Sequence, residues 1–76
     1  MKITISTPMM GDKITDLLTN YKENGVEFKF IKKTGMKLEF EVSGVEGPPA
    51  IDLVKSIVRS TEFGKVLYFS VTETIS

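Results

Sequence analysis

Hydrophobic and polar residues alternate along four stretches of the chain, which is the pattern of strands with one buried face. The first stretch is 2–6, where two isoleucines alternate with polar residues. The second and third, 26–30 and 36–42, follow each other closely, and the fourth is 66–72. The pattern therefore predicts four strands, two of them adjacent in the middle of the chain.

Apolar residues spaced three and four apart indicate a helix between the first two strands. Its stripe contains the following residues: Met10, Ile14, Leu17, Leu18 and Tyr21. Asp12 is expected to be the N-cap, because its carboxylate can accept from the free amides of the first turn. Asn24-Gly25 supplies a left-handed residue, so we expect the helix to end there.

A second helix is predicted before the last strand. Pro49 suits the first helical position, where a missing amide costs nothing, and Gly64 is expected to end the helix. The apolar stripe between them is broad and contains the following residues: Ala50, Ile51, Leu53, Val54, Ile57 and Val58. We expect this helix to lie deep against the sheet.

The two middle strands are predicted to form a hairpin. A two-residue loop would place Phe30 opposite Glu39, on conflicting faces. A three-residue loop, 33–35, avoids the conflict if Gly35 is left-handed, and it pairs Phe30 with Leu38. The same register predicts three further pairs: Val26 with Val42, Phe28 with Phe40, and Lys29 with Glu39.

The order strand, helix, strand, strand, helix, strand fills residues 1–76 and resembles the split βαβ, or ferredoxin-like, motif. It implies one α+β domain, with an antiparallel sheet of four strands in the order 4-1-3-2 and two helices on one face. We then expect segments 6–12, 33–35 and 61–65 to share one end of the molecule. Gly25 and the Pro48-Pro49 connector should share the other end.

Composition narrows the function. Ten basic residues balance ten acidic ones, so no broad positive field favours nucleic acid or an acidic membrane surface. No aromatic residue occupies the outward positions of the first and third strands, where bases would stack. No apolar run approaches the ~20 residues of a membrane span, and we expect a cytoplasmic protein.

Cysteine and histidine are both missing from the sequence. Their absence removes disulfides, thiolate and imidazole metal ligands, and Ser-His-Asp or Cys-His catalytic units. The remaining Lys, Asp, Glu, Tyr and Ser residues show no spacing that marks a catalytic unit. We therefore expect a protein that is not an enzyme and holds no cofactor or metal.

One candidate binding site lies at the first of the two ends. Lysine side chains are expected to approach the start of the first helix, whose amides and dipole favour an anion. The candidate residues are Met10, Gly11, Lys32, Lys33 and Lys65. Lys32 is predicted to point inward over the edge of the core. The alternative is that the lysines are solvated and that Met10 fills the end of the core.

A second candidate surface is the last strand, which is an edge in the order 4-1-3-2. Its exposed positions, Val66, Tyr68 and Ser70, are uncharged, and an unpaired strand edge invites another strand. The other edge carries lysines. We therefore expect either a homodimer through the last strand or a monomer whose edge is shielded by residues 73–76.

Residues 3–28, ITISTPMMGDKITDLLTNYKENGVEF, are similar to the opening of an ACT domain, an amino-acid-sensing regulatory module. The resemblance rests on a strand, a loop with Pro8 and Gly11, an amphipathic helix, and Gly25-Val26-Glu27-Phe28. In ACT domains the proline and glycine are adjacent, whereas Met9-Met10 separates them here. The resemblance implies a sensor that binds a small anionic metabolite at the loop after the first strand.

Two functions follow from the sequence. The leading hypothesis is a small non-catalytic protein-interaction module, which associates with itself or with another protein. The alternative is the ACT-like sensor of a small anionic metabolite.

Overall fold

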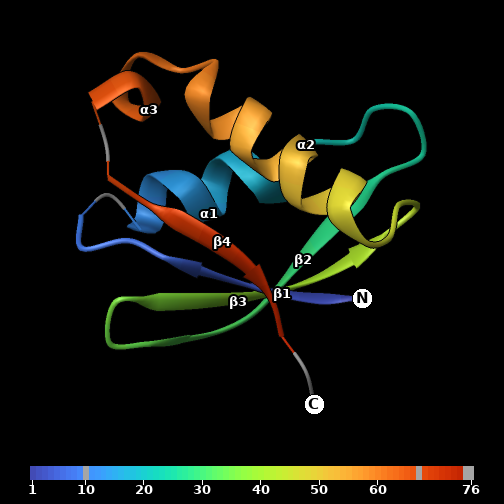
Figure 1. Ribbon diagram of the computed structural model, residues 1–76, viewed down its shortest axis with the longest axis horizontal. Coiled ribbons are helices and arrows are strands. Elements are labelled where there is room, and N and C mark those ends of the chain that lie inside the picture. Colours follow the sequence, from blue (N-terminus) through green and yellow to red (C-terminus); the bar gives the residue numbers. More distant parts are fainter. Residues whose placement is uncertain (10, 67, 75–76) are drawn as a thin grey trace.

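The computed structural model describes residues 1–9, 11–66 and 68–74, apart from the side chains of residues 63 and 66. Helices and sheet form two layers, with α1 and α2 above one face of the sheet (Figure 1). The elements, in chain order, are β1 (Lys2–Ser6), α1 (Gly11–Thr19), β2 (Glu27–Thr34), β3 (Lys37–Ser43), α2 (Pro48–Arg59), α3 (Glu62–Val66) and β4 (Ser70–Glu73).

The four strands form one sheet in the order β2-β3-β1-β4, and each neighbouring pair is antiparallel. The expected order, 4-1-3-2, names the same neighbours from the opposite edge. The predicted α+β class and the four-stranded antiparallel sheet are therefore confirmed. β2 and β4 are the two edges of the sheet, and the described part of the chain places no helix on its second face (Figure 1).

The core lies between the helices and the sheet. Phe40 of β3, Ile14 of α1 and Val54 of α2 are fully buried, so each layer contributes to it. The alternating strand residues and the helical stripes supply the rest of this cluster: Ile3, Ile5, Leu18, Val26, Phe28, Leu38, Val42, Ile57, Val58 and Val71. Burial of this apolar surface is the main contribution that stabilises so small a domain.

The register of the β2–β3 hairpin differs from the predicted one. Phe30 lies opposite Phe40 rather than Leu38, and their rings make an edge contact with centroids 5.6 Å apart. The predicted pairs of Phe28 and Lys29 are wrong in the same direction, and Val42 pairs with Phe28 instead of Val26. Up to Phe30 the faces of the strands are nevertheless as predicted, because a shift of two residues returns every side chain to the same side of a strand.

A β-bulge at Ile31 explains the error. The ladder shifts between Phe30 and Lys32, and the strands then join through a two-residue loop, Gly35-Met36, instead of the predicted three-residue loop. The extra residue of the bulge, and not a longer loop, keeps the side chains of the two strands on matching faces. Gly35 is left-handed, with φ of 59°, as predicted.

Helix α1 ends at Thr19, well before the predicted stop at residues 24–25. The Thr19 hydroxyl donates to the Thr15 carbonyl at 2.9 Å, and the Asn20 side-chain amide donates to the Asp16 carbonyl at 2.8 Å. These side chains satisfy the last carbonyl groups and compete with further helical turns. Residues 24 and 25 both have positive φ, and they form a separate turn before β2.

The starts of both long helices also differ slightly from the prediction. α1 begins at Gly11, so Asp12 lies within the first turn and is not the N-cap. α2 begins at Pro48, one residue early, with Gly47 as its N-cap. The carboxylate of Asp12 is still placed where the helix dipole favours a negative charge.

The segment after α2 differs most from the prediction. Gly64 does not end α2 but lies inside α3, where a methyl group on it would come within 1.7 Å of the Val58 carbonyl oxygen. Glycine therefore serves close packing here and not a left-handed turn. β4 begins at Ser70, so the predicted strand 66–72 is wrong at residues 66, 68 and 69, while residue 67 lies outside the described residues.

Candidate functional site

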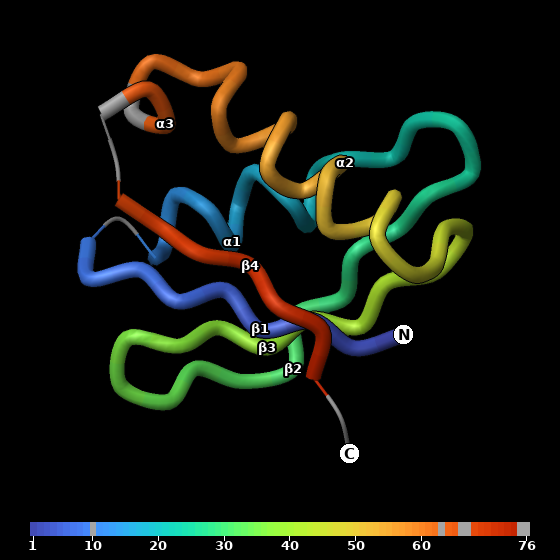
Figure 2. Tube along the Cα trace, viewed as in Figure 1, coloured from blue at the N-terminus to red at the C-terminus, as the bar shows by residue number. Residues whose placement is uncertain are grey.

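The loop after β1 and the tip of the β2–β3 hairpin lie together at one end of the molecule, as expected (Figure 2). A hollow of about 350 Å³ lies between them. Its walls are formed by Thr7, Pro8, Met9, Gly11, Asp12, Lys13, Lys33, Gly35, Met36 and Leu38. A methyl group added to Gly11 would lie 3.9 Å from the Lys33 Nζ, so this ammonium sits over the start of α1.

Lys33, rather than Lys32, is the lysine that turns toward this hollow. The bulge places Lys33 opposite Leu38 and turns Lys32 to the open face, where its ammonium lies 3.5 Å from the Glu39 carboxylate. The prediction that Lys32 points inward is therefore wrong. Met10, another predicted member of this site, lies outside the described residues.

Lys65 borders a different hollow, of about 450 Å³, at the corner where α2, α3 and the chain before β4 meet. The other residues around it are Arg59, Gly64, Tyr68 and Phe69. The Arg59 guanidinium carbon lies 5.8 Å from the centroid of the Phe69 ring. The predicted binding residues thus divide between two places: Gly11 and Lys33 at the first hollow, and Lys65 at the second.

The predicted interaction edge is shorter than expected. Of its three residues, only Ser70 belongs to β4. Tyr68 precedes the strand and is 82% exposed. Val66 is the last residue of α3, and its side chain lies outside the described part of the structure.

Backbone hydrogen bonds show which groups of β4 remain available at the edge. The Thr74 amide donates to the Lys2 carbonyl at 2.9 Å, and the hydroxyls of Thr4 and Thr74 are in contact. Successive residues of a strand turn their backbone groups to opposite sides. Val71 and Glu73 therefore turn their amides and carbonyls away from β1, toward the open edge.

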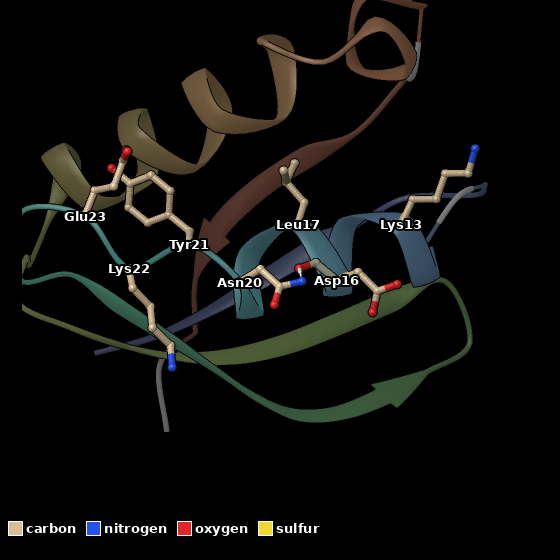
Figure 3. A pocket seen from close by; sticks show the side chains of 7 residues that line it. All are labelled: Lys13, Asp16, Leu17, Asn20, Tyr21, Lys22 and Glu23. Atoms are coloured by element: carbon tan, nitrogen blue, oxygen red, sulfur yellow. Dashed lines mark hydrogen bonds between the residues drawn. The ribbon is translucent and has the colours of Figure 1, made fainter.

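A third hollow, of about 630 Å³, lies along α1 and the turn after it (Figure 3). Leu17 and Tyr21 pack partly against the core there, and Tyr21 makes an edge contact with Phe28 at 5.8 Å. Two lysines and two acidic residues surround them: Lys13, Asp16, Lys22 and Glu23. Sequence reasoning missed this hollow, although Leu17 and Tyr21 lie on the predicted stripe. Its mixed charges favour no single class of ligand.

The described residues hold no group of three or more His, Cys, Asp or Glu side chains that could bind a metal ion. Within the same residues, no helix has the length and apolarity that crossing a membrane requires. Comparison of the chain with protein-family models, with curated proteins and with solved structures finds no match.

Proposed function

We propose that this chain is a ferredoxin-like, non-catalytic interaction module, and that it docks a second copy of itself at the β4 edge. One observation carries the proposal. Among the described residues β4 pairs with β1 on one side only, and its first three residues, Ser70-Val71-Thr72, are uncharged. An uncharged edge with unpaired backbone groups is a template for another strand.

A second copy is the occupant that fits this edge best. An antiparallel pair of identical strands is self-complementary across a two-fold axis, so the free groups of Val71 and Glu73 can bond those of the partner. The chain has a net charge of zero, so two copies do not repel each other at long range. Such pairing would extend the sheet continuously through both copies.

The length of β4 limits the strength of this association. Only four residues form the strand, and the Glu73 carboxylates of two copies would lie near each other. We therefore expect an interface below ~1,200 Å², in the range of weak and transient complexes. Reversible association at high micromolar concentration is the expected behaviour.

The test is light scattering after size exclusion, over a range of protein concentrations. Glu73→Pro removes the outward amide while leaving the bonds to β1 intact, and we expect it to yield monomers at every concentration. Glu73→Ala is the matched control: it keeps the amide and removes the repelling carboxylate, so it should associate as well as or better than the parent. A parent chain that stays monomeric at high micromolar concentration would refute the proposal.

A second candidate, the sensor of a small anionic metabolite, is favoured by the hollow beside Gly11 and Lys33. Leu38 and Pro8 give it an apolar wall, and Lys33 supplies a positive charge. Amide chemical-shift mapping with amino acids, nucleotides and phosphates tests this candidate. Saturable shifts at Gly11 and Lys33 that Lys33→Gln removes would support it, and silence across the set would exclude these ligands.

A further inference from the structure

We propose that the hollow at the α2–α3 corner, bordered by Arg59, Gly64, Lys65, Tyr68 and Phe69, binds a small aromatic anion: a planar ring that carries a phosphate or carboxylate group. The site is independent of the β4 edge. Its support comes from two positive charges that have no carboxylate partner among the described residues, two aromatic rings, and a chain turn held in place by its own hydrogen bonds.

Arg59, the chain's sole arginine, is the last residue of α2. Its guanidinium carbon lies 5.8 Å from the centroid of the half-buried Phe69 ring, within the range of a cation–π contact. The ring thus holds a planar cation with several N–H donors at the border of the hollow. A guanidinium in such a position can bind two oxygens of one phosphate or carboxylate.

Within the described part of the chain, the positive charge at this corner has no carboxylate beside it. Among the described residues, no carboxylate oxygen lies within 4.0 Å of the Arg59 or Lys65 nitrogens. Glu62, three residues from each in sequence, forms no such ion pair. Two cations that border the same hollow attract an anion more strongly than either does alone.

The backbone carbonyls at the end of α2 do not bind the Arg59 side chain either, because the hydroxyls of the next two residues donate to them. The Ser60 hydroxyl donates to the Ile57 carbonyl at 2.6 Å, and the Thr61 hydroxyl donates to the Val58 carbonyl at 2.6 Å. The Gly64 amide then donates to the Thr61 hydroxyl at 3.1 Å. This network fixes the backbone from the end of α2 to Gly64, so this border of the hollow requires little ordering when a ligand binds.

Tyr68 gives the hollow its preference for a ring. It is 82% exposed and stands beside Lys65, so its aromatic face meets water. An aromatic ligand stacked on Tyr68 would cover that face while its anionic group reaches the two cations. At about 450 Å³ the hollow is within the usual size range of small-molecule sites.

The experiment is a titration of the ¹⁵N-labelled chain with phenyl phosphate, followed by amide chemical shifts at constant ionic strength. We expect saturable shifts at Gly64, Lys65 and Tyr68, with an affinity at least ~10-fold above that for inorganic phosphate or phenol, since stacking and charge act together. Benzoate should shift the same amides, which would show that the site binds aromatic anions in general and does not require a phosphate.

Tyr68→Ala tests the aromatic contribution without endangering the fold, because the side chain is mostly in water. We expect it to weaken the binding of phenyl phosphate by about 5-fold or more and to leave the affinity for inorganic phosphate unchanged. Arg59→Lys keeps the positive charge but removes the planar guanidinium, and it should weaken the binding of both anions. Lys22→Gln, on the turn after α1, is the control and should change nothing.

The Glu73→Pro variant should bind phenyl phosphate as the parent does, so failure at the β4 edge and failure at this hollow are distinguishable. Equal affinities for phenyl phosphate and inorganic phosphate would overturn the proposal. So would shifts spread over all the lysines, or unchanged binding in Tyr68→Ala.

Discussion

The two edge strands of the sheet protect themselves to very different degrees. β2 has eight residues, a bulge at Ile31 and three lysines, whereas β4 has four residues and a single charge, Glu73. Charges and bulges on an edge oppose pairing with another chain. The difference implies that pairing is blocked along β2 and permitted along β4, which is why the proposed association uses β4.

The two edge strands also differ in their attachment to the core, and β2 is attached more strongly than β4. β2 contributes Phe28, which is 5% exposed and contacts Tyr21, while β4 contributes only Val71. We expect Phe28→Ala to lower the free energy of unfolding by about 4 kcal/mol, and Val71→Ala by about 2 kcal/mol. Urea unfolding followed by circular dichroism measures both. Equal losses would show that the two edges are anchored equally.

Two glycines beside the edge strands, one in α3 before β4 and one in the loop after β2, give the next largest contrast. An added methyl at Gly64 meets the Val58 carbonyl oxygen, so Gly64→Ala should cost about 3 kcal/mol and disturb the chain before β4. At the hairpin tip, Gly35 has nothing within 4 Å, and Gly35→Ala should cost only about 1 kcal/mol, from its left-handed backbone. A reversed order in thermal unfolding would contradict this view of the two glycines.

Removal of the bulge should make β2 resemble β4. Deletion of Ile31 leaves the pairs on both sides of it, Phe30 with Phe40 and Lys32 with Glu39, in one continuous ladder. Because Ile31 is 41% exposed, we expect a stability change of about 1 kcal/mol or less, together with new association through the straightened edge. Light scattering after size exclusion measures this association. The deletion is made in the Glu73→Pro background, which removes association through β4, and a variant that then stays monomeric would show that the lysines alone protect this edge.

The smallest expected effect concerns the charges of β2. The Lys32 side chain in the ion pair with Glu39 is 63% exposed, so Lys32→Ala should change the free energy of unfolding by less than about 0.5 kcal/mol. A double-mutant cycle with Glu39→Ala isolates the pair. A coupling above about 1 kcal/mol would mean that this lysine stabilises the hairpin as well as guarding the edge.

The faces of the strands were predictable from the sequence because alternation has a period of two. Phe28 and Phe40 are buried as expected, even though the register between them differs by two residues. The bulge at Ile31 was not predictable, since a β-branched residue suits a regular strand as well as a bulge. The assignment of Lys32 to the inward face failed with it.

Helix ends were predicted less well, because one residue type can serve two purposes. Gly64 was interpreted as a stop signal, but it is small because α2 and α3 pack closely there. Thr19 and Asn20 end α1 by bonding back to its carbonyls, a role that helical spacing does not reveal. The candidate sites inherited these errors: Lys65 was expected with Lys33, and it lies at another hollow.

The pairing of β4 with β1 also bears on how the chain assembles. The hydroxyl contact between Thr4 and Thr74 joins residues 70 positions apart, so this edge closes only after nearly the whole chain is present. Until then β1 itself is exposed along one side, and contacts this distant in sequence form slowly. In a concentrated solution of refolding chains, β4 of one molecule could complete the sheet of another. Domain-swapped dimers are therefore the expected misfolded product, with the same strand pairs as the monomer.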